Sequence, residues 1–295
     1  MPKFIRGFLN GLVFGVTQII PGVSGGTVAV ILGFYNELIE AVGHFSSDAR
    51  RHARFLIPLL LGTAAGFLAF AELIDRLLAR HSLPVMYLFI GLVAGVIPHI
   101  YKRARETKPW TVCSLSMVIL AAAVPIAASF LRGDAPSAVP ADVIAGIGAP
   151  YIALLFLAGV LASAALIIPG VSGSFVLLLM GIYPVATHTL SSIRVWAGGM
   201  SDMPLAMDVL KVLLPLGIGI VIGGLSTARL ISRLLRIHRQ TVYRLIFGLL
   251  LGSVAALFRD PMVYRSGAGG MTVAAGCAAL VLGCASSYWL GKKRM

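Results

Sequence analysis

The sequence predicts an all-α integral membrane protein built from two inverted-topology repeats. Three observations lead to this prediction: the composition is strongly apolar, apolar segments of membrane-spanning length fill most of the chain, and one unusual motif occurs twice. The 295 residues are 58% hydrophobic and 12% charged, and their mean hydropathy is +0.94. Soluble globular domains carry about 25% charged residues, so this composition excludes a soluble globule.

Ten apolar segments have about the length that a helix needs to cross a bilayer, roughly 20 residues. Five lie in a first repeat (1–131) and five in a second repeat (150–295), with a connecting loop at 132–149. No small-residue cleavage site follows the basic, apolar N-terminus, so we expect it to belong to the mature protein. We expect the helical segments at about 4–20, 22–42, 55–79, 84–101, 110–131, 150–168, 170–190, 209–231, 241–258 and 270–290.

The repeated motif shows that the two halves share an origin. IIPGVSGGT at 19–27 returns as IIPGVSGSF at 167–175, an offset of 148 residues. Farther along, an offset of 157 residues aligns 58–95 with 215–252 without a gap. The identities in this second block include charged residues, which shared apolar composition would not produce. We therefore infer an internal duplication.

The distribution of basic residues predicts the orientation in the membrane. An odd number of crossings in each half inverts the second half relative to the first, as in many secondary transporters. If the segments alternate sides, sixteen Lys and Arg residues fall on the side of both termini and seven on the other. Basic loops face the cytoplasm, so we expect a multi-pass protein of the cell membrane with both termini cytoplasmic. We interpret the net charge of +13 as this bias and expect no nucleic-acid partner.

Each motif is expected to break a helix. Pro21 and Pro169 remove a backbone donor and clash with the preceding turn, and Gly22 and Gly170 let the backbone turn. Irregular backbone at membrane depth is tolerated only where it is buried in protein or lines a cavity. The motif therefore favours re-entrant helical hairpins over full crossings, although the sidedness of the loops fits both. Two such hairpins would enter from opposite sides and meet near the midplane.

The residues after each break are candidates for binding an anion. The first amides of a helix have no intrahelical partner, and they attract anions together with the positive end of the helix dipole. We expect a phosphate or carboxylate ligand there. The alternative is that each motif is only a helix break whose hydroxyls cap the next helix. The candidate headgroup-binding residues are Ser24, Gly25, Gly26, Thr27, Ser172, Gly173 and Ser174.

Three charged residues are further candidates for headgroup binding or coupling: Arg76, Arg233 and Glu37. The two arginines are related by the repeat, but they could instead snorkel to the membrane interface. Glu37 lies close to an expected helix end, where a solvated position is equally compatible with the sequence. The histidines and cysteines have no metal-ligand spacing, so we expect neither a metal site nor a cofactor.

Small residues also predict how the helices pack. The pairs Gly91/Gly95 and Gly248/Gly252 have the GxxxG form and are related by the repeat. Glycines at this spacing let membrane helices approach closely. We expect both pairs to lie at helix–helix contacts.

At its two PGVSG motifs the chain resembles a family of bacterial and archaeal membrane proteins, long known only as a domain of unknown function, that includes undecaprenyl-phosphate translocases. The resemblance covers nearly the whole chain and includes FLNGLVFGVTQIIPGVSGGTVAVILGFYNELI and IIPGVSGSFVLLLMGIY. It implies transport of a polyprenyl-phosphate carrier lipid, undecaprenyl phosphate, from the outer to the inner leaflet for cell-wall and surface-polymer synthesis. An acidic residue often precedes the first motif in that family, whereas this chain has Gln18, so a proton-coupling acid is not expected there.

Two other functions stay open at this stage. A secondary transporter of a small soluble anion would use the same broken helices. A membrane polyprenyl-diphosphate phosphatase would need clustered acids and an arginine beside the serine, which PGVSGGT and PGVSGSF lack. We therefore expect a transporter with no catalytic residue.

Overall fold

The computed structural model describes residues 3–18, 24–106, 109–130, 148–189, 203–264 and 270–294, and every regular element among them is helical. This confirms the all-α prediction. Seven helical stretches in this part of the chain are long and apolar enough to cross a membrane. The expected connecting loop at 132–149 lies almost wholly outside the described residues.

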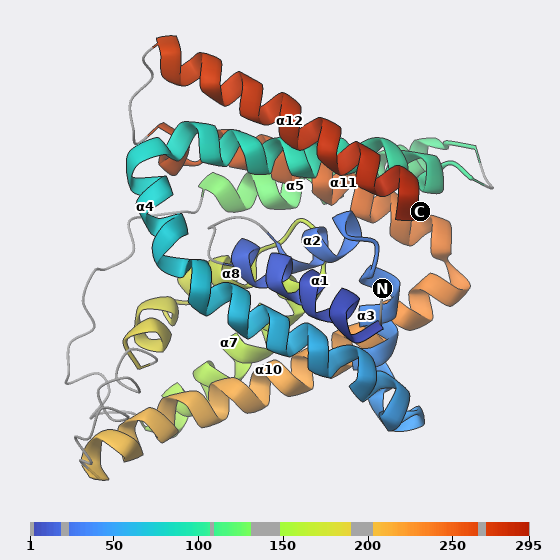
Figure 1. The fold of residues 1–295 in the computed structure, drawn as a ribbon. Helices are drawn as coiled ribbons and strands as arrows, with labels where there is room; N and C mark the ends of the chain where they lie inside the picture. The colour runs from blue at the N-terminus through green and yellow to red at the C-terminus, as the bar shows by residue number, and fades with distance from the viewer. Residues whose placement is uncertain are drawn as a thin grey trace.

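The helices follow one another in an order that repeats (Figure 1). Residues 183–189 are also helical. The elements are α1 (Lys3–Gln18), α2 (Gly25–Ile31), α3 (Tyr35–Gly43), η1 (Phe45–Ser47), α4 (Ala49–Ala104), α5 (Val112–Phe130), α7 (Ala149–Ile167), α8 (Gly173–Leu179), α10 (Met203–Ile237), α11 (Arg239–Phe258), η2 (Pro261–Tyr264) and α12 (Gly270–Arg294).

The segments that follow the two motifs differ from the continuous helices expected at 22–42 and 170–190. Each is split at a glycine in the left-handed region, Gly33 at φ 74° and Gly181 at φ 70°, which only glycine adopts without steric cost. The first helices after the breaks, α2 and α8, have 7 residues each. At 1.5 Å per residue they span about 10 Å, whereas the hydrocarbon core of a bilayer is about 30 Å thick. These lengths favour hairpins, whose placement in a bilayer stays a prediction.

The duplication is visible in the backbone as well as in the sequence. The long helix α4 bends at His81, where φ is −137° and ψ is 46°. The repeat-related residue His238 separates α10 from α11 with φ −127° and ψ 44°. The two halves of α4 therefore correspond to α10 and α11.

Glycine contacts join the helices in pairs. A Cβ atom on Gly91 would collide with the Leu280 carbonyl of α12, and one on Gly248 would collide with the Val118 carbonyl of α5. The GxxxG patterns therefore mark close helix contacts, as predicted. Through these contacts the last helix of each repeat packs on the other repeat.

The helices enclose the two short helices α2 and α8 (Figure 1). On one side lie α5, α11, α12 and the second half of α4, and on the other lie α7, α10 and the first half of α4. All seven residues of α2 are buried. Both segments that follow the helix breaks thus lie between two groups of long helices, and α2 is fully buried whereas α8 is partly exposed.

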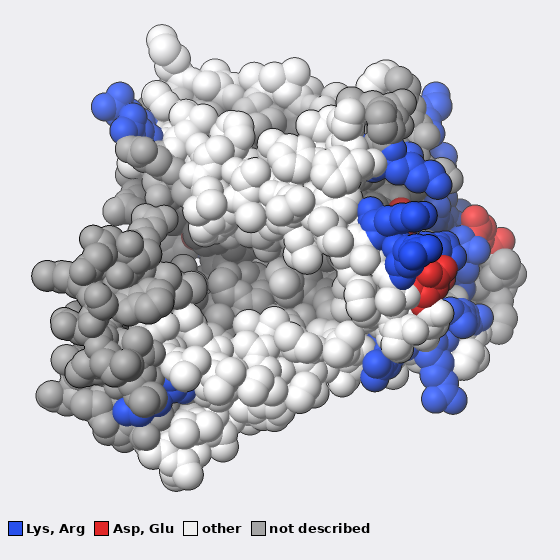
Figure 2. Space-filling view, turned by 60° about the horizontal axis from the view of Figure 1, so that its bottom comes forward, with Lys and Arg blue, Asp and Glu red and all other residues white. Residues whose placement is uncertain are grey.

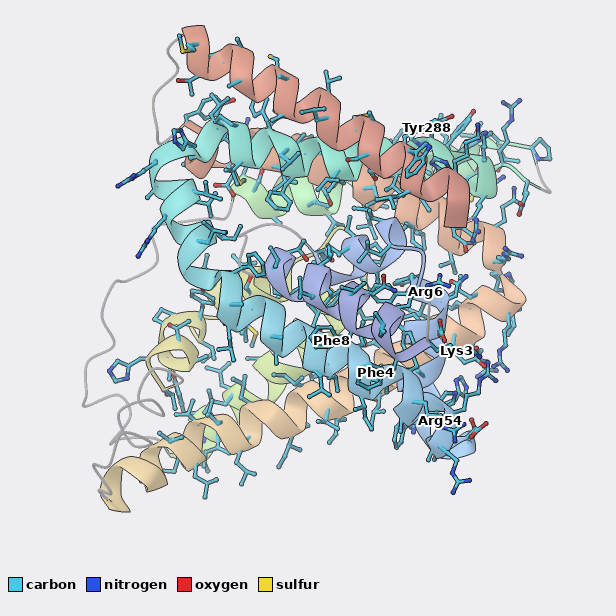
Figure 3. The ribbon with its side chains drawn as sticks, viewed as in Figure 1. Lys3, Phe4, Arg6, Phe8, Arg54 and Tyr288 are labelled. Atoms are coloured by element: carbon cyan, nitrogen blue, oxygen red, sulfur yellow. The ribbon has the colours of Figure 1, made fainter. Side chains whose placement is uncertain are left out.

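Charged residues gather at the end of the molecule that carries both termini. Lys3, Arg6 and Arg54 lie at this end (Figure 3). Figure 2 shows Lys and Arg side chains clustered at one end of a face whose hollowed middle is uncharged. The grouping of charge is that expected of a membrane protein with both termini on one side.

Two glycines of α10 test this packing. A Cβ on Gly219 would collide with the Phe156 carbonyl of α7, whereas one on Gly217 has no neighbour within 4 Å. We expect Gly219→Leu to destabilise the fold by about 1–3 kcal/mol, the usual cost of overpacking, and Gly217→Leu to have little effect. Thermal unfolding of the two detergent-solubilised variants measures this difference. Equal melting temperatures would contradict a close contact between α10 and α7 at Gly219.

Candidate functional site

The two motif tips contact each other in the interior of the protein. The Ser24 hydroxyl donates to the Ile168 carbonyl at 3.1 Å, and the Gly170 amide donates to Thr27 Oγ1 at 2.9 Å. Ser24 is 3% exposed and Thr27 is 1% exposed. The structure therefore brings together the two segments that the sequence places in one site, although Pro21 and Gly22 lie outside the described residues.

Glycine at the first tip is required by this close approach. A Cβ on Gly26 would lie 2.6 Å from the Ile167 carbonyl oxygen and 2.9 Å from the Pro169 nitrogen. A Cβ on Gly25 would lie 2.8 Å from Phe14 Cζ. A larger residue at position 26 would push the tips apart because it meets backbone atoms, whereas one at position 25 would displace side chains, among them Phe14 of α1.

The hydroxyls at the two breaks do not cap the helices that follow. Ser24 and Ser172 occupy the N-cap positions of α2 and α8 with extended backbone, but neither side chain makes a capping hydrogen bond. The Ser24 hydroxyl bonds the other tip, and the Ser172 hydroxyl lies 2.9 Å from the Ser174 hydroxyl. The capping that the alternative requires is therefore not observed at Ser24 or Ser172, and the first amides of α8 lack intrahelical partners.

A small open cleft, with a volume of about 50 Å³, adjoins the second motif. Its walls come from α5 and α11 and are mostly apolar. Three serine hydroxyls and the backbone of the motif supply the polar groups. The lining residues are Val124, Pro125, Ala128, Ser129, Gly170, Val171, Ser172, Ser253, Ala256 and Leu257.

Ser253 fixes the second motif against α11. Its hydroxyl lies 2.9 Å from the Gly170 carbonyl oxygen and 2.7 Å from the Leu249 carbonyl oxygen. Ser253 was not among the residues predicted from the sequence. The offset of 157 pairs Ser253 with Val96. A hydroxyl where the repeat-related residue is apolar could have identified Ser253 from the sequence.

A basic residue borders the cleft. Phe130 and Arg259 follow the lining residues of α5 and α11 along the chain, and Arg259 Cζ lies 4.0 Å from the centroid of the Phe130 ring. Arg259 is exposed and makes no ion pair with a carboxylate in the described part of the chain. From the sequence, Arg259 was predicted only as one of the basic residues on the outer side. Its positive charge is available to an anion that approaches the cleft.

The residues predicted from the sequence as site candidates lie in different parts of the structure. Ser172 and Gly170 line the cleft, Ser174 is exposed beside them, and Gly173 is buried. The candidates of the first motif are buried behind the tip contact. Arg76, Arg233 and Glu37 are exposed on α4, α10 and α3, and none of them lines the cleft. Within the described residues, no group of three His, Cys, Asp or Glu side chains could hold a metal ion.

Comparisons with known proteins identify relatives. The family model described as VCA0040-like, undecaprenyl phosphate translocase-like, matches residues 14–266. The chain is 31% identical over 252 residues to a polyprenyl-phosphate transporter of Staphylococcus aureus, covering 85% of this chain and 84% of the relative. It is 29% identical over 287 residues to a polyprenyl-phosphate transporter of Vibrio cholerae, covering 92% and 83%. No solved structure matches the chain.

The tip contact can be tested by removing one acceptor. Thr27→Val keeps the side-chain shape but leaves the Gly170 amide without its partner. We expect a loss of stability of about 1–3 kcal/mol, the cost of a buried unsatisfied donor. Thr187→Val is the matched control, because Thr187 is exposed and bonds carbonyls of its own helix. If thermal unfolding shows the same loss for both variants, the tip contact does not stabilise the fold.

Proposed function

Because this chain belongs to the undecaprenyl phosphate translocase-like family, we propose that it transports undecaprenyl phosphate or a related polyprenyl phosphate across the cell membrane, from the outer to the inner leaflet. Its relatives from Staphylococcus aureus and Vibrio cholerae are named polyprenyl-phosphate transporters. The transport moves the lipid without making or breaking a covalent bond. It returns the carrier to the cytoplasmic side for cell-wall and surface-polymer synthesis.

The observation that carries this proposal is the cleft at the second motif. Such a lipid combines a phosphate with a long apolar tail, and the cleft combines hydroxyls with apolar walls. Val124 lines the cleft and is still 50% exposed, so the cleft adjoins apolar outer surface. A soluble anion needs no such apolar opening, which is why we favour the lipid over a small soluble substrate.

The second motif supplies donors for the headgroup. A phosphate that leaves water has to regain hydrogen bonds, because burying an unpaired charge is costly. The hydroxyls of Ser172 and Ser174 lie side by side, and the neighbouring amides of α8 are free of intrahelical partners. We assign the headgroup to these donors and the first part of the tail to the apolar walls of α5 and α11.

The distribution of charge indicates the side of the membrane from which the headgroup would enter the proposed site. We place both termini in the cytoplasm on the basis of the basic residues that share their end of the molecule. Arg259 lies among the fewer basic residues that we assign to the outer side. A cation beside an open cleft attracts an anionic headgroup, so Arg259 would receive the phosphate before it reaches Ser172.

Replacing Ser172 tests the headgroup site. Ser172→Leu fills the polar side of the cleft and should lower the rate of polyprenyl-phosphate transport in proteoliposomes by at least about tenfold, equivalent to roughly 1.4 kcal/mol. Ser116→Leu is the matched control, since Ser116 is exposed on α5 and does not line the cleft. Circular dichroism and size exclusion check that both variants fold.

The same vesicles separate the competing functions. The proposal requires that wild-type protein accelerates lipid transport and that Ser172→Leu stops it while Ser116→Leu does not. Uptake of inorganic phosphate without lipid transport would support a soluble-anion transporter. Release of inorganic phosphate from a polyprenyl diphosphate would support the phosphatase.

Replacing Arg259 tests the approach of the headgroup. Arg259→Gln should raise the lipid concentration required for half-maximal transport by up to about fivefold, because an exposed charge contributes about 0–1 kcal/mol. The increase should shrink at high ionic strength, where surface charges are screened. Arg80→Gln is the control, since Arg80 is also exposed and counted on the outer side. An equal response of both variants would show that only the general surface charge matters.

A further inference from the structure

Two arginines converge on one buried tyrosine at the end of the molecule that carries both termini. Tyr243 of α11 is 4% exposed. The Arg103 guanidinium donates to its hydroxyl at 2.7 Å, and Arg103 Cζ lies 5.4 Å from the ring centroid. Arg239 Cζ lies 5.8 Å from the same centroid. Two positive charges therefore share one aromatic ring.

No carboxylate in the described part of the chain neutralises this pair, because neither Arg103 nor Arg239 makes an ion pair there. Arg103 lies in the last turn of α4, where the negative end of the helix dipole offsets part of its charge. The Ala104 carbonyl of the same turn accepts from Gln240 at 3.0 Å and from Arg244 at 3.1 Å. Arg239 opens α11, where the helix dipole is positive. The two guanidinium charges and the start of α11 therefore favour an anion between the arginines.

A buried hydroxyl without a partner lies in the same place. Tyr35 is 5% exposed, and its phenol oxygen has no hydrogen-bond partner. Tyr35 adjoins Asn36 in the chain, and the Asn36 amide donates to the Tyr243 hydroxyl at 3.5 Å. A buried unpaired hydroxyl costs free energy, so this donor is suited to a ligand that enters the cluster.

The cluster joins residues of both repeats, but it has no repeat-related counterpart. The offset of 157 pairs Tyr243 with Met86 and Arg239 with Ser82. Both partners are fully buried, and neither carries a charge. The arginine–tyrosine pairing is therefore specific to this end of the molecule.

We propose that Arg103, Arg239, Tyr243 and the Tyr35 hydroxyl form a second site for a phosphate monoester, at the end of the protein opposite to the cleft. The inference rests on the proposed function, in which this site receives the headgroup after it has left Ser172. Guanidinium groups bind phosphate through charge-assisted and often paired hydrogen bonds. The same chemistry would accept a polyprenyl phosphate headgroup or inorganic phosphate, and it would disfavour a singly charged phosphodiester lipid.

Binding measured with the outer site blocked tests this proposal. The full-length Ser172→Leu protein in detergent is titrated with geranylgeranyl phosphate, and bound lipid is measured by native mass spectrometry. We expect residual binding that falls by about tenfold or more in the additional Arg103→Gln/Arg239→Gln variant. The control is Arg50→Gln/Arg236→Gln, which removes two exposed charges at the same end and should change binding less than about twofold.

Two further titrations identify the ligand class. Inorganic phosphate should compete with geranylgeranyl phosphate, and phosphatidylglycerol should not. Equal competition by phosphatidylglycerol would overturn a monoester site in favour of a general anionic-lipid site. Tyr243→Phe keeps the aromatic ring and removes the hydroxyl, so weaker binding in this folded variant would support the site even if the double arginine variant did not fold.

The outcomes separate this inference from the proposed function. If wild-type protein transports the lipid but binding is insensitive to the arginine pair, or equally sensitive to the control pair, the second site is wrong and the transport function stands. If binding depends on the arginine pair but no transport is measured, the site stands and the transport function is wrong.

Discussion

Backbone polar groups at the two helix breaks need hydrogen-bond partners where no water is present, and the rest of the fold is arranged around this constraint. Irregular backbone in a membrane protein is stable only inside the protein. Here the first tip supplies partners for the backbone of the second, because the Ser24 hydroxyl donates to the Ile168 carbonyl and Thr27 Oγ1 accepts from the Gly170 amide. The first repeat thus satisfies backbone groups of the second, and the helices that pack across the repeats hold the two tips together.

The two similar motifs make different contacts in the structure. In the first copy the motif ends in Gly26 and Thr27, and in the second the aligned residues are Ser174 and Phe175. The glycine allows the close approach of the tips and the threonine accepts the hydrogen bond. In the second copy a hydroxyl at Ser174 stands beside Ser172, in contact with the cleft. One motif therefore stabilises the centre, and the other is open to a ligand.

The class, the duplication, the helix breaks and the glycine contacts could be predicted from the sequence because each depends on local composition, spacing or internal similarity. The split at Gly33 was missed, since an apolar run does not reveal a left-handed turn. The cleft depends on how α5 and α11 lie beside the second motif, and the pairing of Arg103 with Tyr243 joins residues 140 positions apart. Such contacts are set by tertiary packing, which the spacing of residues in one sequence does not specify.

We propose that the second motif holds the phosphate of a polyprenyl lipid. A structure of the protein with a bound polyprenyl phosphate is the decisive experiment. We expect the phosphate within hydrogen-bonding distance of the Ser172 and Ser174 hydroxyls, with the tail leaving between α5 and α11. A phosphate bound away from the cleft, with Ser172 free of the ligand in every state that transports lipid, would show that the second motif is not the headgroup site.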